Sequence, residues 1–129
     1  MAEQDVETVK AAYQAFTSGD LEGAASDMAD DVEWWSSEEV PPGGTYRGRD
    51  EVVQSWATIP DHYDDFTVEP KEYADAGDKV LVVGTLRGKG KNGNAFESRY
   101  AHVFWMGDGK VVRSEFHSDS AAEAKALAG

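Results

Sequence analysis

Hydrophobic residues near the start of the chain recur at the spacing of one helix face. Within the segment 5–17, these positions are Val6, Val9, Tyr13 and Phe16. A second, short helix is expected from Asp20, which can cap the free N–H groups, to Met28. A third is expected to be capped by Asp50 and ended by Pro60. Its apolar side consists of Val52, Val53, Trp56 and Ile59.

In the second half of the chain the hydrophobic period changes to two, which is typical of β-strands. The expected strands are residues 65–74, 79–88, 96–106 and 110–119, separated by turns rich in glycine, aspartate and asparagine. An earlier strand is expected at 30–37, before a loop of prolines and glycines. Ser120 and Glu123 have the spacing of a capping box, which predicts a short C-terminal helix. This order predicts one α+β domain, residues 1–129.

The charge of the chain changes which partners are expected. Twelve basic and 25 acidic residues give a net charge of −13, so nucleic acid would be repelled. There is no cysteine, which excludes disulfides and thiolate metal sites. The start of the chain is polar and acidic, unlike a signal peptide, and no apolar run approaches the ~20 residues of a membrane span. We therefore expect a soluble cytoplasmic protein with neither a nucleic-acid nor a membrane partner.

The glycine-rich segment 43–48 precedes the third helix, which is where a phosphate-binding loop would lie. It matches neither the dinucleotide fingerprint nor the P-loop. In such a loop the phosphate approaches the backbone closely, and the side chains of Tyr46 and Arg47 would stand in its way. A turn with positive φ explains the glycines better. The three histidines are scattered over positions that do not converge. No cofactor and no metal site are therefore expected.

Three segments together resemble the SnoaL-like and ketosteroid-isomerase-like proteins of the nuclear transport factor 2-like superfamily. They are "VKAAYQAFTSGDLEGAASDMADDVEW", "GGTYRGRDEVVQSW" and "YAHVFWMGDGKVVRSEFHSDSAA". The resemblance covers nearly the whole chain, from about Val6 to Leu127. It implies a cone-shaped, strongly curved, mixed but mostly antiparallel sheet packed against three N-terminal helices. It also implies an interior pocket and, usually, a homodimer through the outer face of the sheet.

The resemblance implies candidate site positions but does not settle an activity, because this superfamily contains several kinds of enzyme and non-catalytic modules. Ketosteroid isomerase uses an aspartate base beside a tyrosine and a protonated aspartic acid. The base position matches Ser36, which is a poor proton carrier, so that activity is not expected. The protonated acid matches His102, and the tyrosine falls at or next to Tyr13.

Two other branches of the superfamily can be compared in the same way. The acid–base aspartate of SnoaL-type polyketide cyclases also matches His102, whose ordinary pKa of about 6.5 suits proton transfer. Limonene-type epoxide hydrolases use two aspartates and an arginine. Only Asp119 matches this set, while Lys79 and Leu81 stand at the other two positions. Epoxide hydrolysis is therefore not expected.

Alternation along 96–106 places the side chain of His102 on one face of a strand, and by the resemblance this face lines the pocket. The candidate catalytic residues are His102, as a general acid or base, Tyr13 and Asp119. The candidate ligand-binding residues are Trp34, Ser36, Trp56, Tyr100, Phe104, Phe116 and Ser118. Structural alternatives are that His102 hydrogen-bonds Tyr13 or a strand neighbour, and that Asp119 caps the last helix.

Two functions remain open from the sequence. One is a lyase, isomerase or cyclase that uses His102 to transfer a proton to or from a small, largely apolar, oxygen-bearing ligand. The other is a non-catalytic ligand-binding or dimerisation module of the same fold. Glu115 and His117 are expected to point away from the pocket. Trp105 is expected on the same outer side, where a homodimer would bury it.

Overall fold

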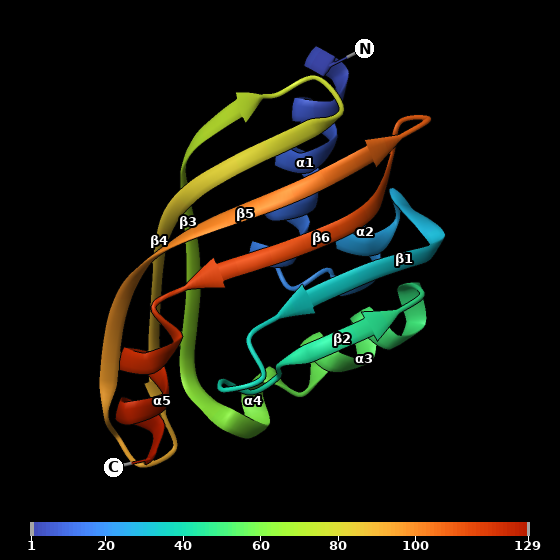
Figure 1. Cartoon of the computed structure of the whole chain (residues 1–129). Helices are drawn as coiled ribbons and strands as arrows, with labels where there is room; N and C mark the ends of the chain where they lie inside the picture. The colour runs from blue at the N-terminus through green and yellow to red at the C-terminus, as the bar shows by residue number, and fades with distance from the viewer. Residues whose placement is uncertain (1, 129) are drawn as a thin grey trace.

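A computed structural model describes residues 2–128 as a curved six-stranded sheet with helices packed against it (Figure 1). The helices are α1 (Ala2–Thr17), α2 (Leu21–Ala25), α3 (Arg49–Ala57), α4 (Ile59–His62) and α5 (Ser120–Ala128). The strands are β1 (Met28–Ser36), β2 (Gly44–Arg47), β3 (Tyr63–Asp75), β4 (Lys79–Gly90), β5 (Ala95–Gly107) and β6 (Lys110–Ser118). None of the helices described is long and apolar enough to cross a membrane.

The sheet is mixed, with the strand order β2-β1-β6-β5-β4-β3. Only the pair β1–β6 is parallel, and all other neighbours are antiparallel. The register places Trp34 beside Ser114, and Ser114 beside Phe104, so residues of three strands lie in one row. The mixed, mostly antiparallel sheet predicted from the sequence is confirmed.

The core lies between α1 and the inner face of the sheet. Val9 and Tyr13 of α1 are buried against β3 and β4. Along β5 the even-numbered side chains from Ser98 to Phe104 are buried, whereas the odd-numbered ones are exposed or half-buried. The two-residue period of the sequence therefore identified the inner face correctly, including the position of His102.

The segment expected to form only a turn contains an additional strand, β2. Gly44–Arg47 pairs with the end of β1, and Trp34 lies opposite Tyr46. Gly48, with a φ of 86°, then turns the chain into α3. The expected cap, Asp50, lies inside the first turn, and Glu51 instead accepts a hydrogen bond from the Arg47 N–H. A carboxylate that reaches back in this way satisfies an N–H group at the helix start.

Two other predicted boundaries were wrong, and at the last helix one of the two predicted caps is observed. The helix α2 ends at Ala25 rather than Met28, because Met28 pairs with Val111 in the sheet. Pro60 does not end α3 but lies in the first turn of α4, where a missing N–H costs little. Asp119 rather than Ser120 caps α5, since its Oδ1 accepts a hydrogen bond from Ala122 N–H at 3.1 Å.

Candidate functional site

A cavity of about 130 Å³ lies between the helices and the inner face of the sheet. Its walls come from all parts of the chain, including α1, α3, β1, β5, β6 and the loop between β1 and β2. An apolar cavity of about 150 Å³ is known to bind benzene, so this cavity has room for roughly one ring. The predicted residues that line it are Tyr13, Trp34, Ser36, Trp56, His102, Phe104, Phe116 and Ser118.

The imidazole of His102 lies in the cavity wall and has hydrogen-bond partners on both nitrogens. Its Nδ1 is 2.8 Å from the hydroxyl oxygen of Tyr13, and its Nε2 is 2.5 Å from Oγ of Ser114. The His102 residue is 4% exposed and Ser114 is fully buried. The rings of Trp34 and Phe104 pack against the imidazole, with centroids 5.0 and 3.9 Å away. The hydrogen bond to Tyr13 is the structural alternative predicted for this histidine.

Burial sets the protonation state of this cluster. The pKa of His102 lies well below its ordinary value of about 6.5, chiefly because burial disfavours the cation and, to a smaller extent, because His117 repels it. Burial likewise raises the pKa of Tyr13. The cluster is therefore neutral near pH 7, with one imidazole nitrogen donating a hydrogen bond and the other accepting one. It can orient or polarise a ligand oxygen as a neutral hydrogen-bonding group.

Two of the predicted site residues do not line the cavity. The ring of Tyr100 is covered because it stacks on Phe116, at a centroid distance of 4.8 Å, and lies against Gly84 of β4. It contributes to the core behind the cavity wall. Asp119 is exposed, and its carboxylate caps α5. Its contacts support the structural alternative and place the carboxylate outside the cavity.

The hydroxyl of Ser36 lines the cavity near its loop. Its Oγ donates a hydrogen bond to the carbonyl oxygen of Pro42 at 3.2 Å. Close by, the hydroxyl of Tyr63 donates to the carbonyl oxygen of Pro41 at 2.6 Å. These two hydrogen bonds hold the proline-rich loop against the cavity.

Sequence reasoning missed Glu123, which lines the cavity from α5 and is only 1% exposed. Its Oε2 accepts a hydrogen bond from Ser98 Oγ at 2.7 Å, and its Oε1 accepts one from Ser118 Oγ at 3.1 Å. Burial raises the pKa of this carboxyl group, and the two serine hydrogen bonds oppose that shift. The sequence contained one signal of this burial. Glu123 is four residues before the apolar Leu127, so the two side chains lie on the same face of the helix.

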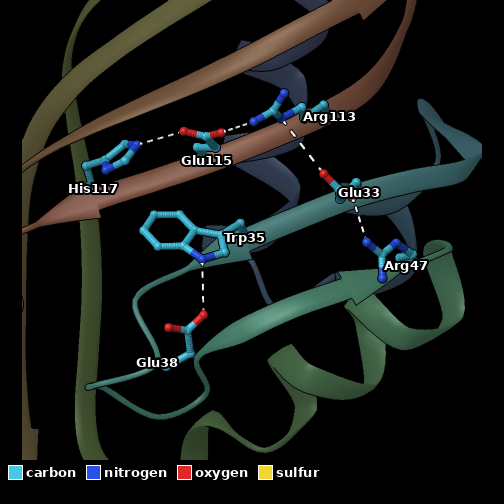
Figure 2. Close-up of polar contacts among 7 residues, drawn as sticks. All are labelled: Glu33, Trp35, Glu38, Arg47, Arg113, Glu115 and His117. Carbon is cyan, nitrogen blue, oxygen red and sulfur yellow. Dashed lines mark hydrogen bonds and ion pairs between the residues drawn. The ribbon is translucent and has the colours of Figure 1, made fainter.

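The outer face of the sheet carries a separate chain of charged contacts (Figure 2). His117 Nε2 is 3.0 Å from Glu115, and Glu115 also pairs with Arg113. Glu33 connects Arg113 to Arg47, with distances of 3.9 and 3.1 Å. The outward orientation predicted for Glu115 and His117 is therefore confirmed, and neither residue belongs to the cavity.

Comparisons with known proteins agree with this architecture. The SnoaL-like domain family matches residues 9–114. A solved nuclear transport factor 2-like protein of unknown function from Burkholderia pseudomallei is 30% identical, with a TM-score of 0.90 and 98% of each chain covered. A second nuclear transport factor 2-like protein, from Burkholderia thailandensis, is 32% identical, with a TM-score of 0.91 and with 95% of this chain and 96% of that chain covered.

A third solved structure is that of TerC, which was co-crystallised with polyporic acid. It is 29% identical, with a TM-score of 0.89, and the match covers 98% of this chain and 99% of that chain. The comparison with curated proteins finds no significant match. The family match over most of the chain, together with these relatives, shows that the chain belongs to the SnoaL-like domain family and has its nuclear transport factor 2-like, ketosteroid-isomerase-like fold.

Proposed function

We propose that the chain binds a small, largely apolar, oxygen-bearing molecule in its cavity, and that His102 transfers a proton to or from it in a lyase, isomerase or cyclase reaction. The observation that carries this proposal is an aromatic-lined cavity with the ring of His102 in its wall. Such a lining with a few convergent polar groups is the usual composition of a small-molecule site. The co-crystallisation of the relative TerC with a small molecule supports it.

Tyr13 connects His102 to a ligand in this proposal. The tyrosine lines the cavity, and its hydroxyl is hydrogen-bonded to Nδ1 of the imidazole. When Nδ1 carries the proton, it donates to the tyrosine oxygen, which leaves the tyrosine O–H free to donate to a ligand carbonyl oxygen. When Nε2 carries the proton instead, Nδ1 accepts the tyrosine O–H, so a proton that the tyrosine oxygen takes from the ligand is passed on to Nδ1. The imidazolium formed in this way returns a proton by the same route to another atom of the ligand, which restores the neutral imidazole. Because the surroundings are apolar, these hydrogen bonds are stronger than they would be in water.

A second candidate function is a non-catalytic ligand-binding module. It is favoured by the fact that protein hydroxyl groups already occupy both nitrogens of His102. In that function the imidazole fixes the shape of the cavity and transfers no proton.

The two candidates separate on substitution of His102 by asparagine. Ligands are first identified by thermal shift from a panel of ketones, lactones and aromatic acids, and their conversion is followed by NMR. If His102 transfers a proton, His102→Asn should lower turnover by roughly 10²- to 10⁴-fold. His117→Asn is the matched control, because the same change on the outer face leaves the cavity intact. Undiminished turnover in His102→Asn would refute the catalytic role, whereas lost affinity without any turnover supports the binding module.

We also propose that the outer face of the sheet forms a homodimer. Leu81 and Val83 of β4 are 37% and 40% exposed, and they alternate with the buried Val80 and Val82. Val103 lies opposite Leu81 on β5 and extends this apolar surface. A second copy of the chain that covers this patch would remove it from water.

Val83→Glu should therefore weaken the dimer roughly a hundredfold, because two uncompensated carboxylates would be buried across the symmetry axis. Ala11→Glu adds the same charge at an exposed position of α1 and should leave the dimer intact. Sedimentation velocity over a concentration series measures both dissociation constants. A wild-type protein that sediments as a monomer at every concentration would exclude this interface.

A further inference from the structure

Glu123 is a buried carboxyl group whose charge is not neutralised by the protein. Within residues 2–128, no lysine, arginine or histidine side chain forms an ion pair with it. Its partners are the hydroxyl groups of Ser98 and Ser118, which carry no charge. A buried carboxylate without a cation is unfavourable, and an apolar residue of similar size is often at least as stable in such a position.

The hydrogen bonds of Glu123 attach α5 to β5 and β6, but the helix has other contacts at both of its ends. At the start, Asp119 caps the N–H of Ala122. At the end, Asn92 Nδ2 donates to the carbonyl oxygens of Ala126 and Leu127, both at 3.0 Å, and Asn94 also donates to that of Ala126. Among the described residues, Glu123 is therefore not the only one that holds α5 in place.

The walls of the cavity suit a positively charged guest. The aromatic side chains in the lining include Phe16, Trp34, Trp56, Tyr63, Phe104 and Phe116. The faces of such rings attract cations, most strongly where water is excluded. Among the described residues that line the cavity there is no lysine or arginine, and a second acidic residue, Asp27, is present. The net charge of −13 also draws cations toward the protein.

We propose that Glu123 binds the ammonium group of the ligand, so that the cavity takes a small amine whose apolar part lies against the aromatic rings. This inference rests on the proposed function, since it requires that a small molecule enters the cavity. Each carboxylate oxygen of Glu123 accepts one hydrogen bond from a serine and retains a lone pair for the ammonium N–H groups. The ammonium group supplies the positive charge that the protein does not.

The amine and the oxygen of the ligand would then occupy different parts of the cavity. Ser98, which holds Glu123, and His102 are four residues apart on β5, and their side chains share the inner face. At about 3.3 Å per residue, their Cα atoms are separated by roughly 13 Å along the strand. The ligand class is therefore a small amine that carries its oxygen away from the nitrogen, with about one ring between them.

The matched probes for this inference are benzylamine and benzyl alcohol, which have the same ring and size but differ in charge at pH 7. Their affinities for the wild-type protein are measured by calorimetry and by NMR titration. We expect benzylamine to bind at least about tenfold more tightly, because only its ammonium group can pair with Glu123. Glu123→Gln should abolish this preference and leave the affinity for benzyl alcohol within about twofold of wild type.

Three further variants separate a contact with Glu123 from other effects. Asp27→Asn removes the other acidic side chain of the lining and should retain the preference for the amine. Ser98→Ala removes a partner of Glu123 but keeps its carboxyl group, so it too should retain the preference. His117→Asn, on the outer face of the sheet, should not change the ratio of the two affinities. Circular dichroism checks that each variant folds, and proton release measured on the wild-type protein keeps the test informative if Glu123→Gln does not fold.

Proton release gives an independent readout. Burial raises the pKa of Glu123, and a bound cation lowers it again, so that amine binding at a pH near the raised value releases protons from this group. Calorimetry in two buffers of different ionisation enthalpy should detect this release for wild type and not for Glu123→Gln.

The outcomes distinguish this inference from the proposed function. If benzyl alcohol binds wild type as tightly as benzylamine does, the amine class is wrong and the small-molecule cavity stands. A preference that survives Glu123→Gln, or that is lost equally in Asp27→Asn, would also overturn the role of Glu123. If neither probe binds at millimolar concentration but a ketone, lactone or aromatic acid does, the inference alone fails; if none of these compounds binds, the proposed function fails with it.

Discussion

Gly84→Ala should lower the free energy of unfolding by about 3 kcal/mol. A Cβ atom at this position of β4 would lie 2.2 Å from the carbonyl oxygen of Glu69 and 2.9 Å from Cα of Pro70. Both are backbone atoms of β3, and the ring of Tyr100 covers the same place at 2.9 Å. Because backbone atoms of a paired strand cannot move aside cheaply, the strand pair must distort. Urea denaturation measures the change.

Gly88→Ala is the matched control on the same strand. Its Cβ would meet the end of the Phe96 ring at 2.4 Å, and this half-buried side chain can rotate away. We expect a loss of at most about 1 kcal/mol. If the two variants lose the same stability, the close approach of β3 to Gly84 is not what makes glycine necessary there.

Phe104→Ala should cost about 4 kcal/mol of unfolding free energy, since Phe104 is only 3% exposed and packs on the imidazole of His102. The substitution also enlarges the cavity, because the ring forms part of its wall. Benzene added at millimolar concentration should therefore raise the melting temperature of the variant more than that of wild type.

Phe66→Ala serves as the control for Phe104→Ala. Phe66 also lines the cavity, but its side chain is half-buried on β3. Phe66→Ala should therefore lower the free energy of unfolding by about half as much as Phe104→Ala. Differential scanning calorimetry with and without benzene measures stability and rescue together. Equal stabilisation of wild type and Phe104→Ala by benzene would show that the new space collapses instead of joining the cavity.

The sequence predicted the elements whose hydrophobic period is long and regular. Alternation along β5 placed His102 on the inner face, because shifting a strand by one residue would expose its whole apolar set. The strand β2 was missed because it has four residues, two glycines flank it, and it needs only one neighbour. Short edge strands of this kind carry little periodic signal.

The site was predictable where one element decides the position of a side chain. Tyr13 and His102 each face inward by the period of their own helix or strand, so their contact could be expected. The bond between His102 and Ser114 depends on the register of β5 against β6, which includes a bulge after Trp105. Glu123 was misread because its spacing from Ser120 already had a local explanation as a capping box. Only the packing of α5 against the sheet shows that its carboxyl group is buried.

The parallel pairing of β1 with β6 has a consequence for how the protein is made on the ribosome. The strand β6 lies between β1 and β5, so residues 110–118 join the hairpin β1–β2, which is synthesised long before them, to the meander β3–β4–β5, which directly precedes them. Until residues 110–118 have been synthesised, no strand connects the hairpin β1–β2 to the meander β3–β4–β5. Contacts so distant in sequence slow the search for the native state. The aromatic residues of the nascent chain therefore lack a closed interior until residues 110–118 have been synthesised.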